Sequence, residues 1–447
     1  MEKSVRTFVF LQGPPSRFWG DLAASLERAG HRVLKVNFSA AERLYWRTRP
    51  GRSYGGSLKA WGGWLAGLIR EEGVTDILYY GDQHPYHRIA ADLAPSLGVT
   101  PFVIEFGYLR PSWITLEKGG MGAWSHFPDE ASQIQALAER LTTIPQEREF
   151  RYPFGVEAFN EVFYHLVNVF LFFLYPRYQA DRFYHPVVEY LSTFLRWARQ
   201  AKRGKREQAR FDAVAARPFV LIPLQLQNDV QIRFNSPYSD QREMLREVFA
   251  SFARHAPADL SIVVKQHPMD VGMIDWTRIV GELAAEYGVG ERVVAIDGGV
   301  LPDMLAKARA VLVINSTVGL HALRAGRPTK VLGAAVYDIG GLSAQMPLDA
   351  FWSDPGTVDM SLVADLVRGL AGTIQVPGSF YNPEGSAAAR RLIVERLLAD
   401  AVNGEGAFVD PPPRLARQAG HGARPASETN PMHVPRDEAD MTIRGQK

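Results

Sequence analysis

Strand-like and helix-like segments alternate along both halves of this 447-residue chain. In the first half, short apolar runs at residues 8–11, 77–80 and 101–105 are separated by amphipathic stretches such as residues 18–29. The same alternation resumes at Pro218. Parallel strands need a long crossover between them, so this pattern predicts parallel sheets covered by helices. We therefore expect an α/β chain with two doubly wound, Rossmann-type domains that face a central cleft.

The composition excludes several classes of protein. The formal net charge is only +2, so nothing favours a nucleic-acid partner. With no cysteine, the chain has no disulfide, thiolate zinc site or cysteine nucleophile. Residues 7–11 are too short for a signal-peptide core, and no apolar run reaches the roughly 18–20 residues that cross a bilayer. We expect a cytoplasmic protein, either soluble or peripheral to a membrane.

The chain divides into four parts. We expect an N-terminal Rossmann-like domain over 1–150, a helical aromatic and basic linker over 151–215, a second Rossmann-like domain over 216–402 and a disordered tail over 403–447. The linker is rich in aromatic residues between 159 and 178, and a basic run with Arg196, Arg206 and Arg210 follows. Its aromatics either pack between the domains beside a solvated basic face, or form a surface for an anionic membrane or lipid acceptor.

Polar residues follow the strands of the second half, where an open parallel sheet binds its ligands. They are Lys265, His267, Pro268, Asp297, Asn315, Ser316, Thr317 and Gly319. Ser316 and Thr317 stand where a helix should begin, and unpaired N–H groups at a helix start bind anions. The alternative is that the His-Pro pair is an ordinary turn and the Asn-Ser-Thr run only an N-cap. Together the segments predict a site for a phosphate-bearing donor, in a chain with no Walker loop and no G-x-G-x-x-G.

A second set of polar residues follows other strands. It consists of Gln12, Gly13, Asp82, Arg88, Glu105, Arg110, Gln225, Asp229 and Gln231. Glu105 either acts in catalysis or caps the following loop, and Arg110 could hold a carboxylate in a bidentate pair. Asp82, with His84, His87 and Arg88, matches no zinc spacing, so we expect polar support or substrate contacts there.

These motifs resemble the bacterial capsular polysaccharide synthesis family of Kdo transferases, and most closely its single-module β-Kdo transferase acting on a lipid acceptor. The matching segments are residues 10–14, 80–82, 85–88, 105, 107–111, 113–117, 223–225, 229, 231–233, 265, 267–268 and 315–320. The resemblance covers about residues 7–382, and the order of its motifs makes it specific.

The resemblance implies a GT-B fold and a CMP-Kdo donor, with the domain over 1–150 on the acceptor side and the domain over 216–402 binding the nucleotide sugar. It implies transfer, with retained β configuration, to a phosphatidylglycerol-type lipid at the cytoplasmic face of the inner membrane, alongside other capsule biosynthesis and export proteins. His267 and Pro268 match the motif that holds the CMP phosphate, and Ser316 and Thr317 would complete that site. Related enzymes often carry two acids before the glycine at Gly107.

Here Phe106 stands where the second acid is expected. Glu105 is therefore the catalytic candidate, as nucleophile, general base or supporting acid, and Asp82 is the alternative. We expect no metal ion and no other cofactor. The charge that develops on the CMP phosphate can be stabilised by Lys265, His267 and the helix start at Ser316.

Two other functions remain open from the sequence. One is a transferase of the same fold that uses a different nucleotide sugar, such as CMP-sialic acid or a UDP-sugar. The other is a non-catalytic capsule export or assembly factor that binds a lipid-linked glycan.

Overall fold

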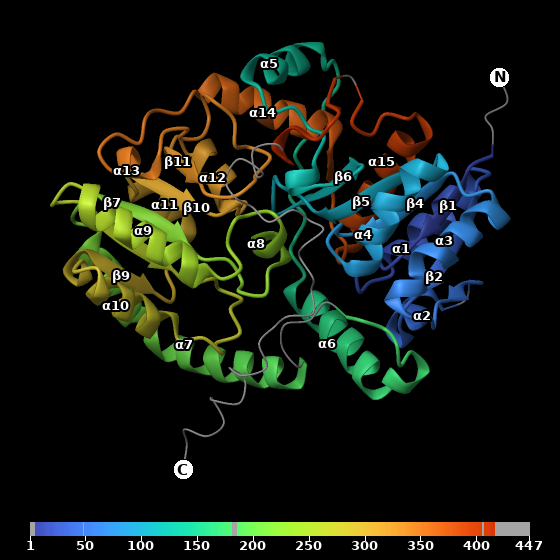
Figure 1. Ribbon diagram of the computed structural model, residues 1–447, viewed down its shortest axis with the longest axis horizontal. Coiled ribbons are helices and arrows are strands. Elements are labelled where there is room, and N and C mark those ends of the chain that lie inside the picture. The colour runs from blue at the N-terminus through green and yellow to red at the C-terminus, as the bar shows by residue number, and fades with distance from the viewer. Residues whose placement is uncertain (1–4, 48, 181–185, 405, 416–447) are drawn as a thin grey trace.

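Two α/β units lie side by side in the computed structural model (Figure 1). The structure describes residues 5–47, 49–180, 186–404 and 406–415, with no side-chain description at 186, 187, 194, 195 and 197–205. Each unit is built around one sheet, and the prediction of two doubly wound α/β domains is confirmed.

The first sheet has seven strands in the order β12-β6-β5-β4-β1-β2-β3. They are β1 (Thr7–Phe10), β2 (Arg32–Asn37), β3 (Arg52–Ser53), β4 (Asp76–Tyr80), β5 (Thr100–Phe106), β6 (Trp113–Lys118) and β12 (Gln375–Pro377). The first five are parallel, whereas β6 runs antiparallel to β5 and β12 runs antiparallel to β6. The alternation of the sequence predicted the parallel part, and the antiparallel edge was not predicted.

The second sheet is wholly parallel, in the order β11-β10-β7-β8-β9. Its strands are β7 (Phe219–Pro223), β8 (Ser261–Lys265), β9 (Val293–Ile296), β10 (Ala310–Val313) and β11 (Thr329–Val331). All five residues of β7 and of β8 are buried, as expected for strands with helices on both faces. Pro223 pairs with Lys265, and Lys265 with Ile296, so these strands end at one edge.

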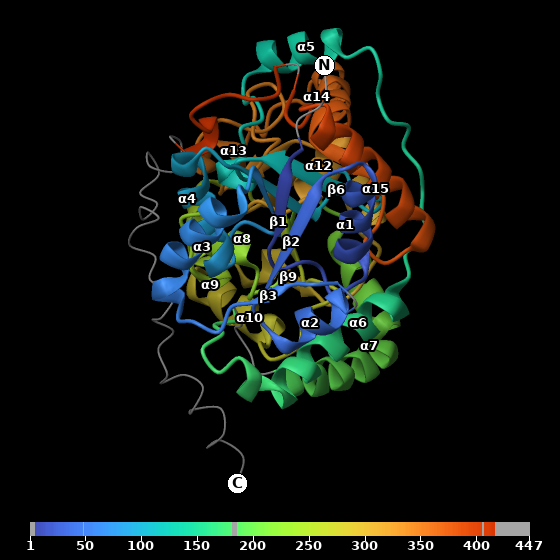
Figure 2. The same cartoon turned by 90° about the vertical axis from the view of Figure 1, so that its right-hand side faces the viewer.

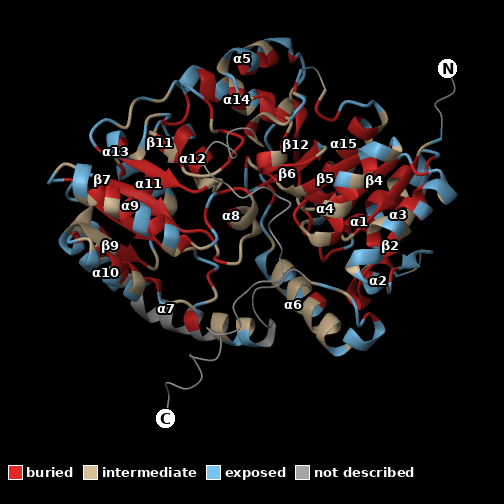
Figure 3. Cartoon of the chain, viewed as in Figure 1, coloured by how far each residue is buried: buried red, intermediate tan, exposed pale blue. Residues whose placement is uncertain are grey.

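Helices cover both sheets (Figure 2). The α-helices are α1 (Phe18–Arg28), α2 (Ala40–Trp46), α3 (Leu58–Glu72), α4 (Pro85–Leu93), α5 (Ala131–Arg140), α6 (Phe154–Phe170), α7 (Pro186–Val214), α8 (Val230–Phe234), α9 (Gln241–His255), α10 (Trp276–Glu286), α11 (Leu301–Lys307), α12 (Val318–Arg324), α13 (Leu348–Phe351), α14 (Met360–Thr373) and α15 (Pro383–Leu398). The 3-10 helices are η1 (Ala94–Leu97), η2 (Gly122–Trp124), η3 (Phe172–Leu174) and η4 (Gly290–Arg292). The buried residues concentrate in the strands and in the helix faces turned toward them (Figure 3).

The C-terminal part of the chain returns to the first unit. β12 pairs with β6, and α15 packs against α1 and contributes Ile393 and Leu397 to the core around Phe8 and Phe10. The predicted boundary at residue 402 is therefore wrong for the segment from β12 onward. The hydrophobic period of the sequence predicts that an element exists, but it does not indicate which sheet that element joins.

The tail predicted to be disordered is ordered over its first part. Ala407 is fully buried, and the Asn403 side chain accepts the backbone N–H of Lys118 at 2.7 Å. Arg414 is 2% exposed and donates to the carbonyls of Phe127 and Pro128 and to those of Ala335 and Val336. A single buried guanidinium thus joins a loop of the first unit to a loop of the second. Residue 405 and residues 416–447 lie outside the described residues.

Replacing Arg414 with Ala is expected to lower the free energy of unfolding by about 2 kcal/mol, because four buried carbonyl groups lose their donor. Urea unfolding followed by circular dichroism measures the loss. Arg391→Ala on α15, an exposed arginine, is the matched control and should be neutral. Equal stability of the two variants would show that Arg414 does not stabilise the contact between the units.

Candidate functional site

Lys265 and His267 lie at the carboxyl end of β8. The Lys265 ammonium donates to the carbonyl of Gly298 at 2.7 Å, and burial lowers the pKa of this lysine. The backbone N–H of Met269 donates to His267 Nδ1 at 3.1 Å. Burial lowers the pKa of His267 to about 4, so the ring is neutral near pH 7. Since Nδ1 is the acceptor, the proton is on Nε2, which is a hydrogen-bond donor for an anion.

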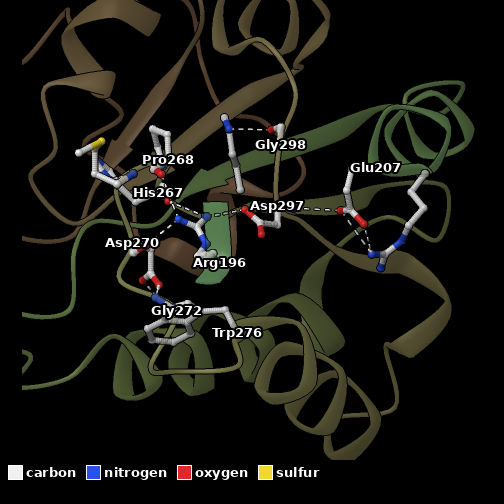
Figure 4. A network of polar contacts seen from close by, with 12 residues as sticks. Arg196, Glu207, His267, Pro268, Asp270, Gly272, Trp276, Asp297 and Gly298 are labelled. Carbon is white, nitrogen blue, oxygen red and sulfur yellow. Dashed lines mark hydrogen bonds and ion pairs between the residues drawn. The ribbon is translucent and has the colours of Figure 1, made fainter. Parts of the chain in front are cut away.

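Arg196 of α7 organises this strand end (Figure 4). Its Nη1 donates to the carbonyls of Pro268 and Asp270 at 3.0 and 2.6 Å. Its Nη2 donates to the carbonyl of His267 at 3.2 Å and pairs with the Asp297 carboxylate at 2.5 Å. The guanidinium therefore fixes the turn that carries His267 to the strand end that carries Asp297.

The Asp297 carboxylate holds other residues of this site in place. It pairs with Arg196, and its backbone N–H donates to Glu207 Oε2 at 3.0 Å. The reading of the basic run as a solvated or membrane face is therefore wrong for Arg196, which is 9% exposed. The side chains of residues 199, 202, 203 and 205, which belong to the same run, lie outside the described residues.

Asn315 joins three of the other predicted site residues. Its Oδ1 accepts from Gln225 Nε2 at 3.0 Å, and Gln225 Nε2 also donates to Asp229 at 3.1 Å. Asn315 Nδ2 donates to the carbonyl of Gln231 at 2.8 Å. The N-cap of α8 is Asp229, which accepts the N–H of Gln231 at 2.9 Å. This network tethers α8 to β10, next to the strand ends of the second sheet.

The start of α12 uses several of its own donors. The N–H of Val318 donates to Ser316 Oγ at 3.2 Å, and that of Gly319 donates to the carbonyl of Ser316 at 3.0 Å. Thr317 is the N-cap, without a side-chain capping bond. A Cβ at Gly319 would lie 2.3 Å from the Tyr337 hydroxyl, so close packing requires glycine there. An anion site at Ser316 and Thr317 remains a prediction.

Glu105 lies near the end of β5 in the first sheet. Its Oε1 accepts the N–H of Phe106 at 3.0 Å, and the hydroxyl of Tyr80 also donates to the carboxylate. Burial raises the pKa of Glu105 to about 6; the two hydrogen bonds and Arg110 oppose the rise, and Asp82 reinforces it. A carboxyl group that titrates near pH 6 can exchange protons close to neutral pH.

The Asp82 carboxylate accepts hydrogen bonds from neighbouring parts of the chain. It is 1% exposed and accepts the N–H of Met121 at 2.9 Å and the side-chain amide of Gln83 at 3.0 Å. Arg88 pairs with Asp92, and its Cζ lies 3.5 Å from the centroid of the Trp124 ring. Asp82 therefore holds the start of the η2 turn, and Arg88 packs α4 against its last residue.

Gln12 and Gly13 follow β1. Gln12 Oε1 accepts the hydroxyl of Tyr178 at 2.9 Å, so the middle of the linker lies beside the end of this strand. A Cβ at Gly13 would lie 2.6 Å from the Trp19 ring, and close packing against that ring requires glycine. A substrate contact by either residue remains a prediction.

Arg110 connects the two groups of strand-end residues. Its charge acts on Glu105 in the first sheet and on His267 and His321 in the second unit. The pKa of His321 is lowered by burial and by neighbouring positive charges, Arg110 among them. The two sheets therefore turn their polar ends toward a shared region. His321 was not predicted, although it lies one helical turn after Thr317.

Two further acids near Glu105 were missed in the sequence. Glu157 and Glu161 are four residues apart on α6, so both project from one face of that helix. The hydroxyl of Tyr381 donates to Glu161 Oε1 at 3.2 Å, and Tyr152 hydrogen-bonds Glu157. Burial raises the pKa of Glu161 to about 7, and the charges of Glu157 and Glu105 add to the rise. The i, i+4 acid pair in an aromatic helix was the available signal.

Helix α6 and the η3 turn also expose large apolar side chains. They are Phe154, Val156, Phe159, Phe163, Phe170, Phe172, Phe173 and Leu174. Phe170, Phe172 and Phe173 are 70, 67 and 60% exposed. In the part of the chain that the structure describes, no helix is long and apolar enough to span a membrane. Across the same residues, no group of three His, Asp or Glu is gathered as metal ligands would be.

Two facing Rossmann-type domains with polar strand ends between them define a GT-B-like α/β protein. Residues 75–381 match the family model described as capsule polysaccharide biosynthesis protein. The chain belongs to this capsule polysaccharide biosynthesis family, as the sequence motifs predicted.

Curated relatives agree with this membership. The chain is 33% identical over 382 residues to the capsule polysaccharide export protein KpsS of Escherichia coli, covering 85% of this chain and 97% of that protein. It is 30% identical over 399 residues to the capsule polysaccharide modification protein LipB of Neisseria meningitidis serogroup B. This match covers 85% of this chain and 93% of that protein.

Among solved structures, the chain resembles the β-Kdo 2,4 transferase of Thermosulfurimonas dismutans KpsC. The identity is 14% and the TM-score 0.40, over 87% of this chain and 98% of that one.

Proposed function

We propose that this protein is a glycosyltransferase that transfers Kdo from CMP-Kdo to a phosphatidylglycerol-type lipid, with retained β configuration, to start a capsule linker. The observation that carries the proposal is the meeting of two polar groups. Lys265 and His267 lie at the end of β8, Glu105 and Arg110 lie at the end of β5, and the charge of Arg110 acts on residues of both groups.

The donor side of the site is suited to a phosphate. A lysine ammonium at the end of β8 is followed two residues later by a neutral histidine with Nε2–H as donor, on a turn that Arg196 holds. These donors would stabilise the charge that develops on the CMP phosphate as its bond to the sugar breaks. Pro268 would support this turn, which is consistent with the motif seen in the sequence.

The sugar side would be formed by residues at the end of β5. Arg110 is exposed and can hold the carboxylate that distinguishes Kdo from a neutral sugar. Glu105 would act at the anomeric carbon, since it is held by two hydrogen bonds and titrates near pH 6. Gln225, which follows β7, and Asp229 and Gln231, at the start of α8, would shape this region.

The acceptor would arrive from the cytoplasmic surface of the inner membrane. The exposed aromatic side chains of α6 and η3 match the side chains that enter the interface of a bilayer. The exposed Arg43 and Arg177 lie on α2, which packs on α6, and just after η3, where they can meet anionic headgroups. The protein would thus be peripheral to the inner membrane.

The decisive experiment is incubation with CMP-Kdo and a short-chain phosphatidylglycerol, with the lipid product read by mass spectrometry. A product heavier than the lipid by one Kdo unit supports the proposal. Thermal-shift screening against CMP, UDP and GDP separates the nucleotide classes, and stabilisation by UDP alone would favour the rival donor. Binding to lipid-linked glycan without release of CMP would favour an export or assembly factor, a role consistent with the name of the E. coli relative.

Replacing Phe170, Phe172 and Phe173 together with Ser is expected to weaken vesicle binding at least 100-fold. Burial of one phenylalanine is worth roughly 1.5–3 kcal/mol, and three exposed rings are lost. Co-sedimentation with phosphatidylglycerol vesicles measures the effect. Met360→Ser, an exposed apolar residue on α14, is the control and should bind normally. Unchanged binding of the triple variant would rule out α6 and η3 as the membrane contact.

A further inference from the structure

Helix α6 has two different faces. One exposes Phe159, Phe163 and Phe170, and the other carries Glu157 and Glu161, the second of which feels the charge of Glu105. Glu161 Oε1 accepts the Tyr381 hydroxyl at 3.2 Å, and its Oε2 lies 3.9 Å from His165 Nε2. One helix therefore links the exposed apolar surface to the acids near Glu105.

Glu161 and Glu105 are held by neighbouring tyrosines. Tyr381 donates to Glu161, and Tyr80 donates to Glu105. The two tyrosines are connected through Phe380, whose ring lies 5.5 Å from that of Tyr80. The two carboxylates thus belong to one cluster, and the charge of each acts on the region around the other.

The groups around Glu161 make its carboxylate suited to accept a proton. The titratable groups that act on it, or on which it acts, are Tyr45, Tyr80, Glu105, Tyr152, Glu157, His165, Glu189 and Tyr381. Partial burial raises its pKa to about 7, three carboxylates add to the rise and the Tyr381 hydrogen bond opposes it, while 38% of the side chain stays exposed. A group that is half ionised near pH 7 both accepts and releases a proton readily.

We propose that Glu161 is a second catalytic carboxylate of the site and acts as the general base that receives the proton of the acceptor hydroxyl. In the transfer step, the acceptor oxygen forms a bond to the anomeric carbon. Because the configuration is retained, the sugar is first carried by the Glu105 carboxylate, after CMP has left with both electrons of its bond. The bond from the anomeric carbon to Glu105 then breaks, with both electrons returning to that carboxylate, and the hydroxyl proton passes to the Glu161 carboxylate. This inference rests on the proposed function, because it concerns the same transfer reaction.

The position of α6 supports this role. If the exposed aromatic face of α6 enters the membrane, the lipid headgroups lie at the depth of the helix itself. Glu161 is carried on the other face of this helix, where a headgroup would be. The headgroup hydroxyl could then reach Glu161 and the anomeric carbon near Glu105 at once. The donor site at Lys265 lies in the other sheet, so the acceptor and the donor approach from different units.

The test is the pH dependence of kcat/KM between pH 5 and 9, measured as lipid product from CMP-Kdo. The unaltered protein should gain activity as pH rises through about 7, where Glu161 ionises. Glu161→Gln should lower the rate about 100-fold and remove this limb, with CMP affinity unchanged. A fluorinated glycerol acceptor, whose hydroxyl is more acidic, should recover part of the loss. Glu149→Gln, exposed just before α6, is the control and should retain the normal profile.

Tyr381→Phe gives a second, independent measurement. It removes the hydrogen bond that favours the Glu161 carboxylate, so the limb near pH 7 should move to higher pH. This result decides the question if Glu161→Gln fails to fold. A normal rate and profile in Glu161→Gln, or an unmoved limb in Tyr381→Phe, would overturn the role of Glu161. Absence of transfer by the unaltered protein would instead overturn the proposed function, and the role of Glu161 with it.

Discussion

Replacing Glu105 with Gln is expected to lower transfer from CMP-Kdo by about 1,000-fold, within the range for loss of an acid or base at the reacting atoms. The carboxylate is held by the N–H of Phe106 and the hydroxyl of Tyr80, so its position is fixed before substrate binds. The amide fills the same space but cannot donate an electron pair as a carboxylate does. Product formation by mass spectrometry and CMP affinity by calorimetry measure the two effects separately.

The pH dependence of stability shows whether this loss reflects misfolding. Burial raises the pKa of Glu105 to about 6, above its value in the unfolded chain, so its ionised form destabilises the folded protein at pH 7–8. The Gln variant should therefore be at least as stable as the unaltered protein there, and the difference should vanish below about pH 4.5. Glu139→Gln, exposed on α5, is the control for activity. Full activity of Glu105→Gln would exclude Glu105 from catalysis.

Replacing Arg196 with Ala is expected to weaken CMP-Kdo binding by about 100-fold, because the turn that carries His267 loses the group that positions it. The change also leaves the carbonyls of Pro268 and Asp270 and the Asp297 carboxylate without this buried donor. Loss of one partner of a buried charge pair costs about 3 kcal/mol. Calorimetric titration with CMP and thermal unfolding measure the two losses.

A matched pair of variants separates position from charge. Arg206→Ala removes an exposed arginine from the same helix and should leave CMP affinity and stability unchanged. Arg196→Lys keeps the charge but lacks the planar fork, so it should recover only part of the affinity. If Arg196→Ala binds CMP as tightly as the Arg206 variant, the turn at His267 does not depend on α7.

The parallel strands were predictable because they are buried on both faces. The strands β1, β4, β7 and β8 are short apolar runs between turn residues, a pattern that does not depend on any distant partner. The edge formed by β6 and β12 was not predicted. β12 has three residues, and its partner β6 lies about 260 positions earlier in the chain, so no local pattern indicates the pairing.

The candidate site was predictable only in outline. Polar residues after strand ends indicated Lys265, His267 and Glu105, because strands of one parallel sheet end at the same edge. The sequence did not indicate which polar groups the chain itself uses. Asp82, Asn315 and Asp297 have their hydrogen bonds within the protein, which is visible only from the folded contacts.

The sequence by itself determined the α/β class, the family and the strand ends at which the polar residues collect, because each depends on local periodicity or on motifs. The tertiary structure decided which residues complete the site. Arg196 lies in a basic run and Glu161 in an aromatic helix, and both meet strand ends more than 50 residues away in the sequence. Burial, and contacts between distant segments, turn these side chains from members of a local pattern into parts of one site.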